Sequence, residues 1–275
     1  MKRSQTWWVI ATALWGCKAD MGPEKPYDVR IPASTELRLI QFQLPVSDSF
    51  TVTGGASDAM SATVRTNVAD LAPKVRETGT LTKVIQRLPS GRTLPDGSTN
   101  RWDVRLGAAT PVLLDVTASD LKGDWSLGGL QLAGLNLGVG VSAPHIHFDT
   151  PNQTAMKDMI VQAGAGDCRI EGLSHTNTRH LKVDGAAGSL YLDFGGTLRR
   201  SASADIRGGV GAATLIIPPA VPVRIDVTSG VGTLTISGLK QEGQTYTSEG
   251  FDEREPHWSI DLAVSNGAID VRPAP

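Results

Sequence analysis

A glycine-centred corner recurs through the second half of the chain and strongly limits the folds that the chain can adopt. Gly-x-Gly triplets occupy residues 138–140, 164–166, 209–211 and 230–232, with a degenerate copy at 186–188 and a weaker one at 266–268. In the first five copies along the chain, the last glycines lie 26, 22, 23 and 21 residues apart. A nearly fixed period of about 20–25 residues, with a short strand on each side of the corner, is typical of stacked rungs in a coiled β-structure.

The runs beside each corner alternate between apolar and polar residues. Val223, Ile225 and Val227 are separated by Arg224 and Asp226, and a period of two places the apolar side chains on one face of a strand. Each rung leaves its apolar face half exposed until the next rung covers it, so several rungs must stack. Glycine at the corner permits a positive φ or a close backbone approach between rungs. The sequence therefore predicts an all-β fold, a single-stranded coiled β-solenoid similar to a parallel β-helix.

The two ends of the expected solenoid depart from the repeat. Residues 34–110 contain alternating runs but no regular corner, and we expect an N-terminal β cap and early strands there. The glycine-cornered solenoid is expected over 111–275. Its end contains a polar insertion at 239–258, followed by strands at 258–264 and 268–271 that close the coil as a C-terminal cap. Irregular caps are expected because open strand edges promote association.

The N-terminus has the pattern of a processing segment. Lys2 and Arg3 precede ten largely apolar residues at 6–15, which is too short a run to span a membrane core. Residues 14–17, Leu-Trp-Gly-Cys, resemble a bacterial lipobox. This resemblance implies that residues 1–17 are a signal peptide ending at Cys17, whose thiol becomes the lipidated mature N-terminus. The alternative is an ordinary secretory signal with cleavage elsewhere.

The lipobox resemblance also implies a location and a spacer. The mature chain would be anchored to the bacterial cell envelope through its lipid, and Lys18 after the cysteine favours the outer membrane in a Gram-negative cell. Residues 18–33 are rich in proline and charge, which predicts a flexible tether. Removal of Lys2 and Arg3 leaves 24 basic and 28 acidic residues, a net charge of −4. This charge gives no electrostatic basis for binding nucleic acid.

Two stretches resemble known families of exported bacterial β-proteins. Residues 101–106, 111–116 and 130–140 resemble the toast-rack family, and residues 209–232 resemble the C-terminal domain of LiaF-like envelope stress proteins and related adhesin-like proteins. The resemblance implies a parallel, helically coiled β-architecture. Members of these families are adhesin-like or accessory proteins of the stress response, and no shared catalytic or cofactor-binding residues carry over to this chain.

Two of the five histidines are spaced so that they could bind a metal ion together. His145 and His147 flank Ile146, so on a strand both point to one face and could share a metal ion, with Asp149 as a third ligand. The favoured alternative is a solvent-facing polar pair opposite buried apolar residues, and no metal site is assigned. His175 and His180 are expected to be exposed near a turn, and His257 to pack on its neighbour Trp258.

Other chemistry-bearing residues have simple structural explanations. The chain has no G-x-S-x-G, H-E-x-x-H or P-loop sequence. Asp103, Asp115, Asp120 and Asp124 could supply the carboxylates of a β-helix lyase, but they are equally explained as outward residues and turn formers. Cys168 lies in an apolar alternation and is expected to be a small buried hydrophobic residue rather than a reactive thiol.

Four aromatic residues are candidates for binding a partner. Trp102, Trp125, Tyr246 and Trp258 stand beside charged or polar residues, as is common at interaction surfaces, although each is better explained as filling a cap or a rung end.

Taken together, these features of the sequence predict a non-enzymatic envelope lipoprotein without a cofactor, acting as an adhesin-like or scaffold module for an envelope protein or polysaccharide. The alternatives are an accessory or sensor protein of the envelope stress response and a carbohydrate-active solenoid enzyme.

Overall fold

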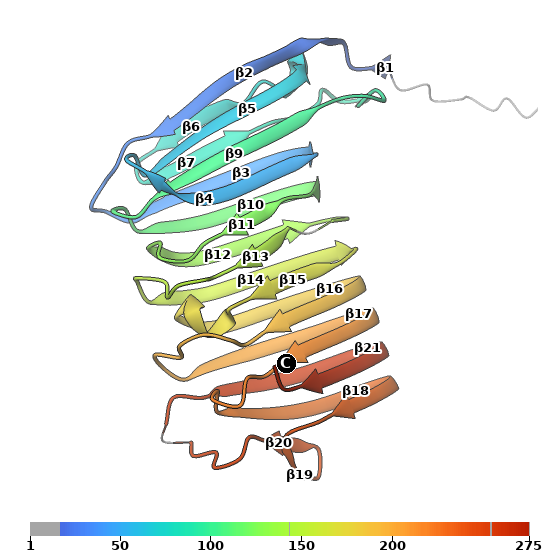
Figure 1. Cartoon of the computed structure of the whole chain (residues 1–275). Helices are drawn as coiled ribbons and strands as arrows, with labels where there is room; N and C mark the ends of the chain where they lie inside the picture. The colour runs from blue at the N-terminus through green and yellow to red at the C-terminus, as the bar shows by residue number, and fades with distance from the viewer. Residues whose placement is uncertain (1–16, 143, 254, 275) are drawn as a thin grey trace, which may run out of the picture.

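The computed structural model describes residues 17–142, 144–253 and 255–274, and these residues form a long stack of β-strands (Figure 1). The predicted signal peptide, residues 1–16 before Cys17, lies outside the described residues. Two short 3₁₀ turns, η1 (Ala69–Leu71) and η2 (Leu173–Thr176), interrupt the strands. Within the described ranges, no helix is long and apolar enough to cross a membrane. The strands are β1 (Cys17–Lys18), β2 (Met21–Ile31), β3 (Arg38–Ser47), β4 (Ser49–Ala56), β5 (Met60–Val68), β6 (Lys74–Thr78), β7 (Leu81–Ile85), β8 (Arg92–Thr93), β9 (Asn100–Gly107), β10 (Val112–Leu121), β11 (Asp124–Ser126), β12 (Leu132–Val139), β13 (His145–His147), β14 (Met156–Ala165), β15 (Cys168–Glu171), β16 (Thr178–Asp193), β17 (Ala202–Ile216), β18 (Val223–Ile236), β19 (Lys240–Glu242), β20 (Thr245–Thr247) and β21 (Trp258–Arg272).

Each rung of the stack consists of two strand segments joined at a corner. The first segments, β3, β10, β12, β14 and the start of β16, pair in parallel, and the second segments, β11, β13 and β15, pair in parallel beside them. The start of β16 pairs with β14, and its later part pairs with β15. From β16 onward, one long strand therefore supplies both segments of a rung. This arrangement confirms the predicted all-β, parallel, solenoid-like fold.

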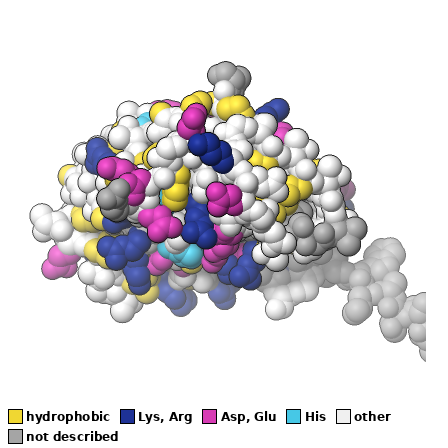
Figure 2. All heavy atoms as spheres, turned by 90° about the horizontal axis from the view of Figure 1, so that it is seen from below, with side chains coloured by type: hydrophobic (Ala, Val, Ile, Leu, Met, Phe, Trp, Pro, Cys, Tyr) yellow, Lys and Arg dark blue, Asp and Glu magenta, His cyan; other side chains and the backbone are white. Residues whose placement is uncertain are grey.

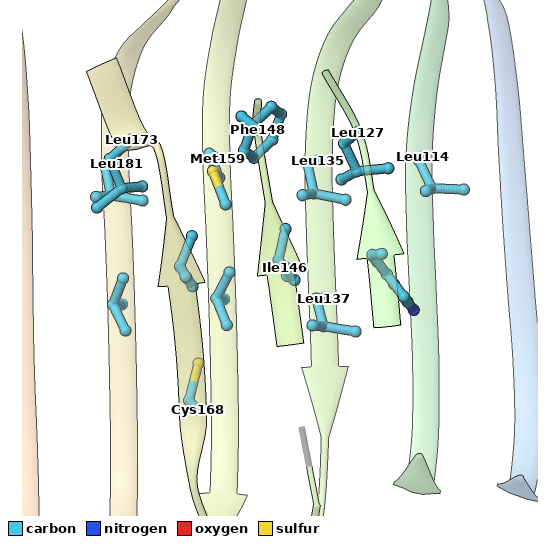
Figure 3. Packing of buried hydrophobic residues seen from close by; sticks show 14 of the residues in the cluster. Leu114, Leu127, Leu135, Leu137, Ile146, Phe148, Met159, Cys168, Leu173 and Leu181 are labelled. Carbon is cyan, nitrogen blue, oxygen red and sulfur yellow. The ribbon is translucent and has the colours of Figure 1, made fainter. Parts of the chain in front are cut away.

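Apolar side chains from both segments meet inside the stack. Leu114, Leu135, Met159 and Leu181 occupy matching positions on four successive strands, and all four are fully buried. Figure 3 shows these residues beside apolar side chains of the other segments, among them Ile146. Alternate residues along each strand face inward, as the burial pattern of β14 illustrates. Every rung therefore covers the apolar face of its neighbour, which is the main stabilising term of such a fold.

The corner glycines form a column in which neighbouring backbones nearly touch. Gly188 pairs in register with Gly211, Gly211 with Gly267, and Gly267 with Gly232. A Cβ atom added to Gly211 would lie 1.9 Å from the carbonyl oxygen of Gly188, and one added to Gly188 would lie 2.1 Å from that of Gly166. Gly188 and Gly211 also have φ values of 115° and 139°, which favour glycine. Both predicted reasons for glycine at the corner, a positive φ and close backbone approach, are confirmed.

The strand order at the C-terminal end differs from the expected one. We expected the last strands to close the coil, but β21 lies between β17 and β18 and pairs in parallel with both (Figure 1). The polar insertion instead forms β19 and β20; β20 pairs antiparallel with residues 224–226 at the start of β18, and β19 pairs antiparallel with β20. The corner at Gly267 is therefore a full rung rather than a weak ending. Spacing along the sequence could not show this, because the sequence of a corner does not indicate which rung it adjoins.

The insertion leaves a charged surface at this end of the stack. Figure 2, which views the molecule from this end, shows basic and acidic side chains interspersed. Arg224 contributes to this mixture, since its guanidinium lies 3.1 Å from Asp226 and 3.2 Å from Glu253. Charged side chains and a covering hairpin are common protections for an edge that would otherwise pair with another chain.

The segment expected to be a flexible tether is a strand instead. Residues 21–31 form β2, which pairs antiparallel with β5 at the opposite end of the stack, and Val29 and Ile31 are buried. Pro26 is accommodated because a terminal strand can lack one backbone donor. The apolar alternation at Tyr27, Val29 and Ile31 indicates a strand, but the neighbouring prolines and charged residues favoured the interpretation as a tether. Antiparallel pairs of β5 with β9 and of β6 with β7 complete this end.

The first described residues also pack on this end. Cys17 pairs with Arg92 in the short parallel ladder of β1 and β8, and Ala19 is buried against Val68 and Leu71. An ion pair of 3.6 Å joins Lys18 to Asp96. The backbone from Cys17 to β2 is therefore held against the folded body instead of extending from it.

The glycine column can be tested with a matched pair of alanine substitutions. Gly211→Ala places a methyl group against the Gly188 carbonyl and forces alanine into a positive φ, so we expect it to lower the free energy of unfolding by about 1–3 kcal/mol or more. Gly138→Ala enters open space and is expected to change the stability by less than about 1 kcal/mol. Urea denaturation of the two variants measures the difference. Equal midpoints for both variants would show that the corner glycines are not required sterically.

Candidate functional site

A cluster of histidines and carboxylates lies on the outer face of three successive short strands. Asp124 of β11 is in register with His145 of β13, and His145 is in register with Arg169 of β15. Two residues further along, His147 is in register with Glu171. The intervening Trp125, Ile146 and Ile170 are fully buried, and this inward anchoring directs the polar side chains outward.

Asp124 lies between the two imidazole rings. Its carboxylate oxygens are 3.4 Å from Nδ1 of His145 and 3.2 Å from Nδ1 of His147, and the ring centroids are 5.5 Å apart. One ligand atom from each of the three residues fits within a mutual distance of 4.8 Å. Nδ1 of His147 is buried and makes no hydrogen bond. We call Asp124, His145 and His147 the outer-face triad; its donor atoms have the types and spacing that can hold a cation.

Further carboxylates contact the outer side of this triad. Nε2 of His145 is in hydrogen-bond contact with Glu171, and Nε2 of His147 lies 3.6 Å from Asp149. Partial burial of the Glu171 carboxyl opposes its ionisation, but hydrogen bonds from Arg169 and His145 outweigh it and hold the pKa of Glu171 below its usual value. Glu171 is therefore a carboxylate at neutral pH, and it fixes the orientation of the His145 ring.

The structure changes which carboxylate belongs with the histidines. The sequence pointed to Asp149 on the same strand face, but Asp124 from the preceding rung lies closer, and Glu171 from the following rung was missed. Asp124 lies 21 and 23 residues before His145 and His147, and Glu171 lies 26 residues after His145, within the range of spacings between the glycine corners. Aligning the repeats could therefore have indicated them. His145 and His147 do face outward opposite buried Ile146 and Phe148, as expected.

A shallow groove crosses another part of the stack. Its volume is about 610 Å³, and it runs over β10, β12, β14, β16, β17 and β21. A column of outward residues in register, Thr117, Gly138, Gln162, Asp184 and Arg207, runs along it. Glycines on several of these strands replace side chains and so create the hollow. The lining residues are Thr117, Ala118, Gly138, Val139, Gly140, Gln162, Ala163, Gly164, Asp184, Gly185, Ala186, Arg207, Gly208, Gly209 and Ser265.

The other histidines differ from their expected surroundings. His175, expected to be exposed, is half-buried and its Nδ1 lies 2.9 Å from the carbonyl oxygen of Phe148. His180 is more open and is 2.9 Å from Ser203 Oγ. His257 packs edge-on against Phe251, at 5.1 Å between ring centroids, rather than on Trp258. The β19–β20 insertion explains this difference, because it brings a second aromatic ring to the loop before β21.

The four aspartates that could supply lyase carboxylates have separate surroundings. Asp103 lies 3.8 Å from Arg105, and Asp115 accepts a hydrogen bond of 2.9 Å from Gln41. One carboxylate oxygen of Asp120 is buried without a hydrogen bond. Asp124 is the one of the four that contacts histidines within the described part of the chain. The expectation that these aspartates are outward-facing residues or turn formers fits Asp103 and Asp115.

The tryptophans are core residues rather than binding residues. Trp102, Trp125 and Trp258 are buried, and each indole N–H donates a hydrogen bond, to Gln86, the Phe50 carbonyl and Ser174 respectively. Neighbouring charged residues in the sequence were misleading because they belong to the opposite strand face. Tyr246 is half-buried and packs against the edge of the core.

Cys168 is buried as expected. Burial raises the pKa of its thiol to about 12, because the surrounding apolar side chains disfavour the thiolate. The group is therefore unreactive at neutral pH and acts as a small core residue.

A family model matches most of this architecture. The model, described as the N-terminal domain of toast-rack (DUF2154), matches residues 33–157 and 150–216, which together make up more than half of the chain. This chain belongs to the toast-rack family. The family resemblance stated from residues 101–140 is thereby confirmed, and the parallel stack described above is the form that the fold takes in this toast-rack protein. A search of curated proteins found no match to the chain.

A comparison with solved structures finds proteins that are distant in sequence. A proposed cell adhesion protein from Clostridium sporogenes is 17% identical, with a TM-score of 0.48, and the alignment covers 92% of this toast-rack chain and 100% of that chain. A proposed adhesin from Bacteroides fragilis is 10% identical, with a TM-score of 0.42 and coverage of 91% and 97%. A proposed lipid-binding protein from Parabacteroides distasonis is 9% identical, with a TM-score of 0.36 and coverage of 91% and 98%.

Proposed function

We propose that this toast-rack protein is a non-enzymatic, adhesin-like binding module of the bacterial cell envelope, which holds an envelope protein or polysaccharide along its groove. The observation that carries the proposal is the groove of about 610 Å³ across six strands. Its walls belong to a continuous hydrogen-bonded stack, so they are held in place before a partner arrives. A preformed surface loses less conformational entropy on binding than a flexible one.

The chemistry of the groove suits an extended polar partner. Gln162, Asp184 and Arg207 follow one another on adjacent strands and offer an amide, a carboxylate and a guanidinium in a row. These groups can hydrogen-bond to hydroxyls, amides or charged groups spaced along a polymer. Gly138 leaves a gap in the same row, where a group from the partner can approach the backbone.

The anchor is the second part of the proposal. Lipidation of Cys17 after removal of residues 1–16 would fix the chain to the membrane, since two or more acyl chains give stable anchoring. Support comes from the lipobox-like residues 14–17 and from the position of Cys17 beside β8, at the end of the stack that carries β2. With no long tether between Cys17 and β2, this end of the stack would rest near the membrane. The strands that form the groove would then project away from it.

Site-specific photo-cross-linking tests the groove. A benzophenone amino acid replaces Gly138, where an added side chain meets open space inside the groove, and in a matched control it replaces Gly22, which is also open but lies on β2. Irradiation of living cells is expected to give a defined adduct with an envelope protein or glycan from position 138 and none from position 22. Equal adducts from both positions, or none from position 138, would contradict binding in the groove.

Mass spectrometry tests the anchor. The mature N-terminal peptide is expected to begin at Cys17 and to carry acyl chains, and Cys17→Ala is expected to release the protein from the membrane fraction. Asp20→Ala, which keeps the cysteine, serves as the control and should remain in the membrane fraction. An unmodified N-terminus, or a cleavage site elsewhere, would refute the lipid anchor without affecting the test of the groove.

A further inference from the structure

We propose that the outer-face triad, Asp124, His145 and His147, binds a Zn²⁺ ion, with Glu171 as a partner that orients one of the histidines. The site would lie on the outer face of β11, β13 and β15. It is separate from the groove proposed as the partner-binding surface, because the two share no lining residue.

The hydrogen bonds of His145 fix which ring nitrogen can bind a metal. A carboxylate accepts hydrogen bonds, so the contact between Glu171 and Nε2 assigns the proton of the neutral imidazole to Nε2. Nδ1 then carries a free lone pair, and it faces Asp124 at 3.4 Å. An imidazole that donates its other N–H to a carboxylate is the usual arrangement around zinc.

His147, two residues further along β13, also has a carboxylate near each ring nitrogen. Its Nε2 lies 3.6 Å from Asp149, while its Nδ1 faces Asp124 at 3.2 Å. That Nδ1 atom is buried and makes no hydrogen bond. Two ring nitrogens and one carboxylate thus converge, and a cation between them would satisfy all three.

The spacing of these atoms suits zinc. Bonds of about 2.0–2.1 Å in a tetrahedral site place neighbouring ligand atoms about 3.3 Å apart. One Asp124 oxygen lies 3.4 Å from Nδ1 of His145 and the other lies 3.2 Å from Nδ1 of His147, both close to this value, and one ligand atom from each residue lies within 4.8 Å of the other two. Imidazole ligands favour zinc and neighbouring transition metals over Mg²⁺ and Ca²⁺, which prefer oxygen ligands.

The fold holds the triad rigidly and leaves one coordination position available. Parallel pairing fixes Asp124 opposite His145, and Trp125 and Ile146 anchor the two strands in the core. Three protein ligands leave a fourth position for water or for a group of a bound partner. A hollow of about 530 Å³, lined by both histidines, adjoins the triad and provides space for that ligand.

Zinc titration of the full chain tests this site. The protein is purified without a polyhistidine tag, stripped with a chelator and titrated with Zn²⁺ against a chromophoric competitor. We expect one Zn²⁺ per chain. Glu171→Gln is expected to weaken binding about 10-fold, as is common for partners of ligating histidines, and His147→Ala more than about 100-fold. Zn²⁺ should also raise the melting temperature of the wild type, because it binds the folded state.

The control is His180→Ala, which removes an outward histidine that lies 3.8 Å from Asp205 but is not part of the triad. It should leave zinc affinity unchanged. Far-UV circular dichroism of each variant confirms that the stack is intact, and Asp124→Asn provides a ligand variant of nearly the same shape. Absence of zinc binding at millimolar concentrations, or binding that survives both His147→Ala and Asp124→Asn, would overturn the proposal.

Discussion

The close approach of backbones at the glycine corners is the constraint on which the rest of the structure depends. At this column, any side chain would collide with the carbonyl oxygen of the neighbouring rung, as the distance of 1.8 Å from a Cβ on Gly267 to the Gly211 oxygen illustrates. Because the corners meet in register, the strands on both sides also meet in register. The apolar faces then stack into one continuous core, in which each rung covers the next.

In-register stacking also determines where functional groups gather. Residues separated by about one repeat lie side by side on the outer face, so each surface column collects one side chain from every rung. The outer-face triad arises in this way from two rungs, and the row along the groove takes four polar side chains and one glycine gap from five rungs. The same regularity that stabilises the core therefore builds rigid arrays of polar groups. Such arrays suit recognition of extended partners and can bind ions without a flexible loop.

Local patterns in the sequence predicted the repeating unit but not the path between units. The corners, the two-strand rungs and the outward direction of His145 and His147 followed from periods of two and of about 22 residues. The insertion of β21 between β17 and β18 could not be predicted, since Gly232 and Gly267 are equivalent corners. The position of Asp124 and Glu171 beside the histidines depends on the register between rungs, and the spacing along the sequence gives that register only approximately. The sequence left open whether Trp102 and Trp125 are core or binding residues. Their polar neighbours in the sequence suggested a surface, but these neighbours face the opposite side of the strand.

Disulfide trapping across the last rungs tests the central claim of in-register stacking most directly. Asp205 of β17 and Asp226 of β18 are each paired with Asp261 of β21. Adjacent strands lie about 4.8 Å apart, within the range for a disulfide, whereas strands two positions apart lie too far from each other. Native Cys168 is buried, so it should not compete. The cysteine pair 205/261 should oxidise readily and the pair 205/226 should not; the reverse result would contradict the strand order and register described here.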